Sequence, residues 1–131
     1  MRTVLAHNPY CVAGPYQDIY SHAVETDARR TLYVSGQVGV ANDGSVVDSF
    51  AGQTRQAIAN LIAVIEGAGM SPQNIVRLGF FLVRRADFAE LADLRRELLP
   101  GIRPAITNVL VAGLVSAAWL IEVEATVVAD S

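Results

Sequence analysis

Two carboxylates near the end of the chain, Glu122 and Glu124, have the spacing that most clearly suggests chemistry. They belong to residues 119–128, where apolar and polar residues alternate as in a half-buried strand. Residues two apart on a strand share a face, so both carboxylates lie opposite the apolar residues of the run. A carboxylate on an enclosed face can accept a proton from water, and we predict that Glu122 is a catalytic base. The alternative for Glu122 is a carboxylate bound to backbone amides, and for Glu124 we expect a structural role.

The other reactive side chains are scattered along the chain. Cys11 is the single cysteine, so the sequence offers no disulfide framework and no cysteine-based metal site. His7 and His22 are distant from each other, and together with Cys11 they do not supply a set of metal ligands. We therefore predict no metal, and because the sequence has no phosphate-binding glycine loop we also predict no cofactor. For His22 we expect a polar role at the surface or at an interface.

Composition limits the class of protein. A chain of 131 residues suits a single domain spanning residues 1–131. The net charge is −3 and no stretch is rich in basic residues, so we predict no nucleic-acid partner. No apolar run is long enough to cross a membrane and the start of the chain carries no signal-like segment, so we expect a cytoplasmic protein. Hydrophobic residues make up 52% of the chain, which favours self-association.

Apolar residues at helical spacing predict two helices. The first spans residues 50–68, with Ser49 as N-cap and Gly69 directly beyond its C-terminus. The second begins at Asp87, whose side chain is expected to form a capping box with Glu90. Together with the strands, these helices predict an α+β fold in which one mixed sheet carries two helices on one face.

Five strands are predicted around these helices, after an irregular start over residues 1–17 that contains Pro9, Gly14 and Pro15. The last strand would present Leu120 beside the two carboxylates on the face away from the helices. Such a face is unfavourable in a monomer, so we expect neighbouring copies of the chain to enclose it. The predicted strands occupy residues 19–25, 31–40, 75–83, 107–114 and 119–128.

Seven short motifs occur in order between about residues 14 and 128. They are YSHAV at 20–24, SGQ at 35–37, QTRQA at 53–57, EGAG at 66–69, DF at 87–88, RPA at 103–105 and IEVEA at 121–125. Each motif alone is weak, but their order and spacing resemble those of the reactive-intermediate deaminase family, the RidA-like or YjgF/YER057c/UK114 proteins.

The resemblance implies a chorismate-mutase-like fold, a homotrimer and three clefts between subunits. It also implies cofactor-free hydrolysis of small reactive enamines and imines, such as 2-aminoacrylate, to a ketoacid and ammonia. In that family an arginine directly after the Pro-Ala pair binds the substrate carboxylate, and the first glutamate of the last strand positions or activates water. The pocket tyrosine stays open between Tyr16, in the better local match, and Tyr20, which fits the family spacing better and is favoured. The implied site consists of catalytic Glu122 and Tyr20 and substrate-binding Ser35, Gly36, Gln37, Ala92, Arg103 and Ile106.

The chain departs from the family pattern at the substrate anchor. Ile106 follows the Pro-Ala pair where the family has arginine, and Ala92 replaces a usual asparagine. Arg103 is close in sequence but lies three residues before Ile106, so on a strand it would point to the other face. We expect Ile106 to lie in the same cleft as Glu122. We therefore predict an enzyme for an enamine or imine less anionic than 2-aminoacrylate; the alternative is a non-catalytic trimer that binds a ligand or protects other proteins.

Overall fold

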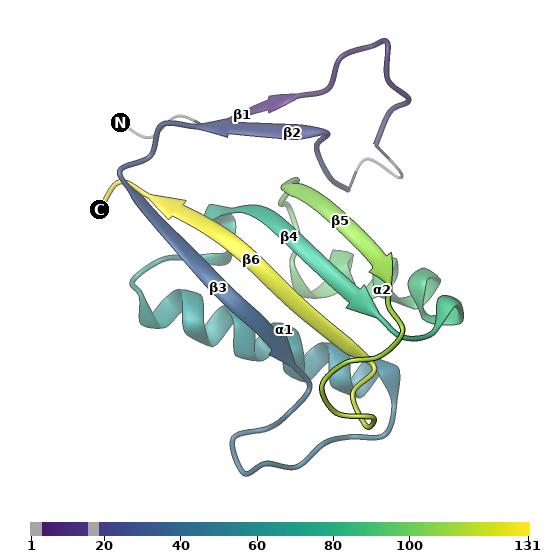
Figure 1. Cartoon of the computed structure of the whole chain (residues 1–131). Coiled ribbons are helices and arrows are strands. Elements are labelled where there is room, and N and C mark those ends of the chain that lie inside the picture. The colour runs from purple at the N-terminus through teal and green to yellow at the C-terminus, as the bar shows by residue number, and fades with distance from the viewer. Residues whose placement is uncertain (1–3, 16–18) are drawn as a thin grey trace.

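A four-stranded mixed sheet forms the centre of the molecule, a computed structural model that describes residues 4–15 and 19–131. Its strands are β3 (Arg30–Val38), β4 (Ile75–Leu82), β5 (Ala105–Leu110) and β6 (Ile121–Ala129). They lie in the order β3-β6-β4-β5 (Figure 1), with β5 parallel to β4 and the other neighbours antiparallel. β5 starts two residues earlier than predicted, which places Ile106 inside the sheet.

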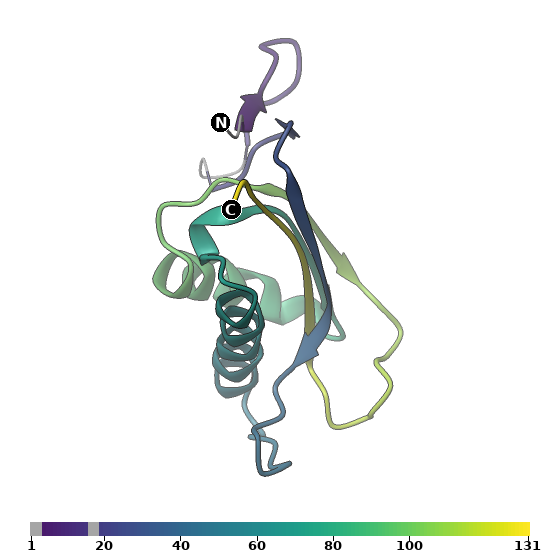
Figure 2. The same cartoon turned by 90° about the vertical axis from the view of Figure 1, so that its left-hand side faces the viewer.

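Helices α1 (Phe50–Gly67) and α2 (Phe88–Leu98) cover one face of this sheet (Figure 2). The Ser49 hydroxyl accepts a hydrogen bond from the Gly52 N–H at 3.0 Å, which confirms the predicted N-cap of α1. Beyond its end, Gly69 has a φ of +77°, a conformation that strongly favours glycine. The predicted α+β fold, a mixed sheet with two helices on one face, is confirmed.

The predicted capping box of α2 is wrong. A short 3-10 turn, η3 (Arg85–Asp87), runs directly into α2, so Asp87 has helical dihedrals (φ −83°, ψ −12°) instead of the extended conformation of an N-cap. Its carboxylate accepts two hydrogen bonds from the Arg84 guanidinium, at 2.8 and 3.2 Å, and caps no helical N–H. A second 3-10 turn, η2 (Pro72–Asn74), leads into β4.

The N-terminal part of the chain differs from the prediction. The expected irregular start contains strand β1 (Val4–His7), which pairs antiparallel with β2 (Ala23–Thr26) in a separate two-stranded sheet. The predicted strand 19–25 therefore does not join the main sheet as a whole, and only Ser21 forms a single parallel bridge to Ala105. β1 is only four residues long, too short for its alternation to be recognised in the sequence.

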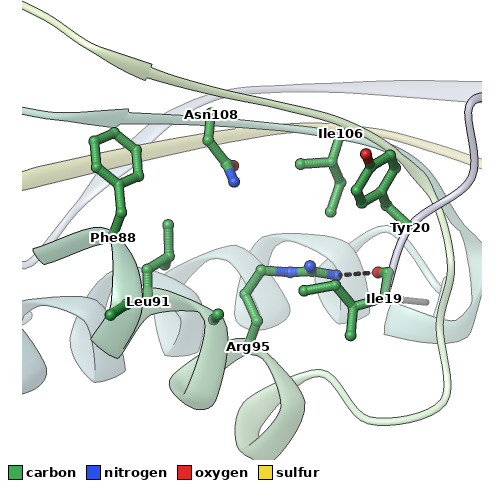
Figure 3. Close-up of a pocket in the computed structure, with 9 residues that line it drawn as sticks. Ile19, Tyr20, Phe88, Leu91, Arg95, Ile106 and Asn108 are labelled. Atoms are coloured by element: carbon green, nitrogen blue, oxygen red, sulfur yellow. Dashed lines mark hydrogen bonds between the residues drawn. The ribbon is translucent and has the colours of Figure 1, made fainter. Parts of the chain in front are cut away.

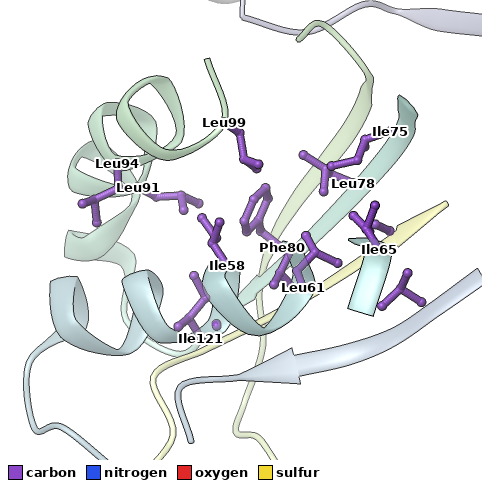
Figure 4. Packing of buried hydrophobic residues seen from close by; sticks show 14 of the residues in the cluster. Ile58, Leu61, Ile65, Ile75, Leu78, Phe80, Leu91, Leu94, Leu99 and Ile121 are labelled. Carbon is purple, nitrogen blue, oxygen red and sulfur yellow. The ribbon is translucent and has the colours of Figure 1, made fainter. Parts of the chain in front are cut away.

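The hydrophobic core lies between the helices and the sheet (Figure 4). The predicted alternation in β6 is confirmed, because Ile121, Val123, Ala125 and Val127 are buried on the helix side. Burial of each large apolar side chain contributes about 1.5–3 kcal/mol, so a slip of one residue in register would be costly. From the other elements the core includes Ile58, Leu61 and Ile65 of α1, Leu91 and Leu94 of α2, and Leu78, Phe80 and Leu82 of β4.

The opposite side of the sheet, here called the open face, carries Tyr33, Gly79, Phe81, Glu122 and Glu124. The strand register defines it, because Phe81 pairs with Glu122 and Gly79 with Glu124, while their neighbours along β4 are buried under the helices. No described helix covers this face, and the Tyr33 side chain is 79% exposed (Figure 2). Leu120 was also predicted here, but it precedes β6 and packs against the core.

Candidate active site

On the open face, the Glu122 side chain lies directly over the backbone of Gly36. A Cβ atom at position 36 would overlap the Glu122 carboxylate, so the absence of a side chain on glycine makes this packing possible. The register of β3 against β6 shifts between Val34 and Gln37, a β-bulge that includes Gly36. The Gln37 side-chain amide donates to the Ser35 carbonyl at 3.1 Å. The structure thus brings Glu122 together with the predicted segment Ser35–Gln37.

Glu124 shares the open face with Glu122 but packs on a different strand. A Cβ atom at Gly79 of β4 would lie 3.1 Å from the Glu124 Cγ, so the stem of Glu124 covers this second glycine. Each carboxylate of β6 therefore has a glycine on a neighbouring strand beneath it. Only the glycine under Glu122 belongs to the predicted site.

A cavity of about 530 Å³ lies on the other side of the sheet, between α2 and β5 (Figure 3). We call it the α2/β5 cavity. Its walls are largely apolar, and its polar groups come from Tyr20, Arg95 and Asn108. Three residues predicted for the site, Tyr20, Ala92 and Ile106, line this cavity together. They come from three separate segments of the chain.

The segment before β2 positions Tyr20. The Ser21 N–H donates to the Pro104 carbonyl at 2.9 Å, and the Ser21 hydroxyl donates to the Arg103 carbonyl at 2.6 Å. These bonds attach the segment to the start of β5, so that the Tyr20 ring lies beside Ile106 (Figure 3). Tyr16, the alternative pocket tyrosine, lies outside the described residues.

Arg103 and His22 lie outside the α2/β5 cavity. Arg103 is exposed and lines a neighbouring hollow of about 410 Å³, in agreement with the expectation that it projects elsewhere. The His22 ring nitrogen lies 2.6 Å from the Ala13 carbonyl, and its backbone N–H donates to the Asn8 side chain at 2.7 Å. The His22 ring meets Tyr20 edge to face, with 5.8 Å between centroids. His22 therefore has polar bonds to the N-terminal segment.

Arg95 of α2 is the residue that sequence analysis missed. Its side chain is only 3% exposed, and it runs along the floor of the cavity beneath Ile106 and Tyr20 (Figure 3). One Nη donates to the Ile19 carbonyl at 3.0 Å, whereas the buried Nε–H has no hydrogen-bond partner. Burial, and to a lesser extent the nearby positive charge of Arg96, lowers the pKa of Arg95 to about 10, so the guanidinium stays charged at neutral pH. Its position four residues after Leu91, on the apolar stripe of α2, was the sequence feature that indicates burial of the Arg95 side chain.

The two parts of the predicted site lie on opposite faces of the sheet within one chain. Ile106 pairs with Leu78, which is buried under the helices, and it packs against the same core. Glu122 pairs with Phe81 on the open face. Paired residues of neighbouring strands share a face, so Ile106 and Glu122 of one chain point away from each other. Within one chain the two residues therefore cannot line one cleft; that they share a cleft between different copies stays a prediction.

No helix in the described part of the chain is long and apolar enough to span a membrane. Within residues 4–15 and 19–131, no group of three or more His, Cys, Asp or Glu side chains could hold a metal ion.

Comparison with known proteins identifies the family. The family model described as Endoribonuclease L-PSP matches residues 14–129. The 2-iminobutanoate/2-iminopropanoate deaminase of Dermatophagoides farinae is 32% identical over 130 residues, which cover 98% of this chain and 94% of that protein. The mitochondrial protein mmf1 of Schizosaccharomyces pombe is 40% identical over 100 residues, which cover 76% of this chain but only 57% of mmf1.

A solved structure agrees with these sequence relatives. YyfB from Yersinia pestis, a protein of unknown function of the conserved Rid protein family, superposes with a TM-score of 0.86 and is 33% identical, covering 95% of this chain and 98% of YyfB. The chain therefore belongs to the Endoribonuclease L-PSP family, which confirms the resemblance to the reactive-intermediate deaminases. Ile106 follows Pro104 and Ala105 in this chain, at the position where the resemblance implies an arginine.

Proposed function

We propose that the chain is a cofactor-free hydrolase of small enamine or imine metabolites in which Glu122 activates water. The packing of the Glu122 carboxylate on Gly36 carries this proposal, because it joins the Ser-Gly-Gln motif to the glutamate of the last strand. The relative from D. farinae, which covers almost the whole chain and is named an imino-acid deaminase, supports the same reaction class.

The proposed reaction needs only water and one base. An enamine first takes up a proton on carbon and loses one from nitrogen, which gives the imine. Glu122 accepts a proton from water as its oxygen bonds to the imine carbon, and this proton passes to the nitrogen. The hydroxyl proton of this adduct then passes to the nitrogen as the carbon–nitrogen bond breaks, so that ammonia leaves and the carbonyl product forms. Imine and water are thus converted to a carbonyl compound and ammonia without an oxidant or a reductant.

The proposed site is complete only between two copies of the chain. Glu122 and Gly36 would come from the open face of one copy, and Tyr20, Ala92 and Ile106 from the α2/β5 cavity of the next. This arrangement accounts for the exposure of Tyr33 on the open face, which a neighbouring copy would cover. A cyclic homotrimer, as the family resemblance implies, would contain three equivalent sites.

Two residues of the α2/β5 cavity, Ile106 and Arg95, bear on the charge of the substrate. The sequence predicts a substrate less anionic than 2-aminoacrylate because position 106 has no cation. Arg95 supplies a buried cation elsewhere in the same cavity, so Ile106 alone does not decide this question.

The proposed function excludes RNA as a substrate and places the chain in the cytoplasm. We do not propose ribonuclease activity, because the net charge is −3 and the open face presents two carboxylates where an RNA backbone would require cations. The cytoplasm remains the proposed compartment of this chain, although the relative mmf1 is a mitochondrial protein.

Substitution of Glu122 by Gln tests the proposal. With an imine generated in situ, we expect Glu122→Gln to lower the rate of ammonia release by about 10²–10⁴-fold, because a general base is removed. Glu124→Gln, on the same face, is the matched control and should change the rate by less than about tenfold. Light scattering should show the same oligomer for all three proteins.

Two results would contradict the proposal. One is a wild-type rate equal to the uncatalysed rate; the other is an unchanged rate in folded Glu122→Gln. Either result would favour the alternative, a non-catalytic trimer that binds a ligand, which the replacement of two family residues by Ala92 and Ile106 makes plausible.

A further inference from the structure

Arg95 is a buried cation without a carboxylate partner among the described residues. Of its donors, one Nη is engaged by the Ile19 carbonyl, and the Nε–H is buried and unbonded. The other arginines for which ion pairs are seen, Arg55, Arg84 and Arg96, pair with Glu97, Asp87 and Asp93 respectively. A charge that is almost completely removed from water without a counter-ion costs stability, so its presence in a cavity calls for a ligand of opposite charge.

The surroundings of Arg95 restrict the chemistry of such a ligand. Arg95 is the single charged side chain among the described residues that line the α2/β5 cavity. One cation matches a monoanion, and the flat fork of a guanidinium matches a carboxylate. The walls beside it are apolar, from Phe88, Leu91 and Ile106, while Tyr20 and Asn108 offer polar contacts. The cavity therefore suits a small monocarboxylate with an apolar body.

We propose that Arg95 is a relocated carboxylate anchor, which binds the carboxylate of a small 2-imino or 2-oxo acid from helix α2 in place of the missing arginine on β5. The guanidinium lies beneath Ile106, on the floor of the cavity rather than on its strand wall (Figure 3). The carboxylate would thus sit deeper, toward α2, with the apolar body of the acid against Ile106 and Leu91. The role in substrate binding rests on the proposed function, whereas the anion site itself does not.

A stable product analogue tests the anion site without catalysis. The probe is 2-oxobutanoate, and its neutral control is 2-oxobutanamide, which has the same shape without the charge. Calorimetry with the full chain should give a weaker dissociation constant for 2-oxobutanoate in Arg95→Met by about 10- to 150-fold, the usual effect of losing a charge-assisted hydrogen-bonded contact. Arg96→Gln removes a charge from the next residue of α2, which lines the neighbouring hollow and not the α2/β5 cavity, and should change the dissociation constant by less than about fivefold.

The thermal midpoint separates this role from a structural one. Arg95→Met should unfold at the same or a higher temperature than the wild type, because methionine fills the space without an unpaired charge. If Arg95 only stabilised the fold, the midpoint would fall, and carboxylate and amide would bind alike. Wild-type protein that binds the amide as tightly as the acid, or binds neither, would overturn the proposal without any variant.

Glu122→Gln distinguishes failure of the anion site from failure of the proposed function. This variant should bind 2-oxobutanoate at least as tightly as the wild type and still depend on Arg95, because it removes a carboxylate that faces the cavity from the neighbouring copy and would repel the anion. Tight, Arg95-dependent binding without imine hydrolysis would support the anion site and contradict the hydrolase. Imine hydrolysis that is unaffected by Arg95→Met would support the hydrolase and contradict the role of Arg95 as the substrate anchor.

Discussion

The two faces of the central sheet present different environments to a substrate. The helix face holds a cavity with a buried guanidinium, mostly apolar walls and a tyrosine. The open face holds two carboxylates over glycines and an exposed aromatic ring. One face therefore suits the binding of an anion and the other the activation of water, and the thickness of the sheet separates them within a chain.

This separation makes the proposed chemistry depend on assembly. A single chain holds each half of the site but cannot bring the halves together, because strand pairing fixes Glu122 and Ile106 on opposite faces. The opposite charges of Arg95 and Glu122 are also kept apart in the isolated chain, because the two side chains lie on opposite sides of the sheet. A variant on one face should then alter either water activation or anion binding, but not both.

Among the variants that test the difference between the two faces, Gly36→Ala is expected to have the largest effect, a loss of imine hydrolysis. The added methyl would occupy the space of the Glu122 carboxylate and displace it, so imine hydrolysis should fall at least about hundredfold, as it does when a general base is misplaced. Binding of 2-oxobutanoate should persist. Gly79→Ala is the matched control, because its methyl meets Glu124 instead at 3.1 Å from Cγ. Equal loss of activity in both variants would contradict a specific role for the contact between Gly36 and Glu122.

Smaller changes, in stability and in the affinity for 2-oxobutanoate, are expected when a cation is placed at position 106 on β5. Ile106→Arg alone places a second guanidinium in the cavity of Arg95 and should lower the free energy of unfolding by about 1–3 kcal/mol. In the Arg95→Met background the same change should cost less stability than in the wild type and should recover most of the lost affinity for 2-oxobutanoate, because one cation again faces the cavity. Chemical denaturation and calorimetry on the four proteins of this cycle measure both quantities. No recovery in the double variant would mean that position 106 does not face the anion site.

The sequence predicted those features that periodicity controls. The apolar spacing predicted the length and caps of α1 and the buried face of β6. The motifs selected Tyr20, Ala92 and Ile106, which the structure places around one cavity. Strand β1 was missed because four residues carry too little pattern.

The errors concern long-range pairing and side-chain reach. Which face of β5 a residue occupies depends on its register with β4, which a single sequence does not specify. Arg95 was missed because a long side chain can run along a helix surface and place its charge far from its own Cα atom. The proposed anchor of the substrate was therefore the hardest residue to find.

A subunit-mixing experiment tests the central claim, that each site joins the open face of one copy to the α2/β5 cavity of another. Glu122→Gln and Arg95→Met homotrimers should each hydrolyse imine slowly. After exchange of subunits at equal amounts, about a quarter of the wild-type rate should return, because a site is intact only where an unaltered Glu122 meets an unaltered Arg95 at random pairing. Mass spectrometry would confirm the mixed trimers. No recovery in proven mixed trimers would contradict the account, since a site built within one chain would remain defective in every subunit.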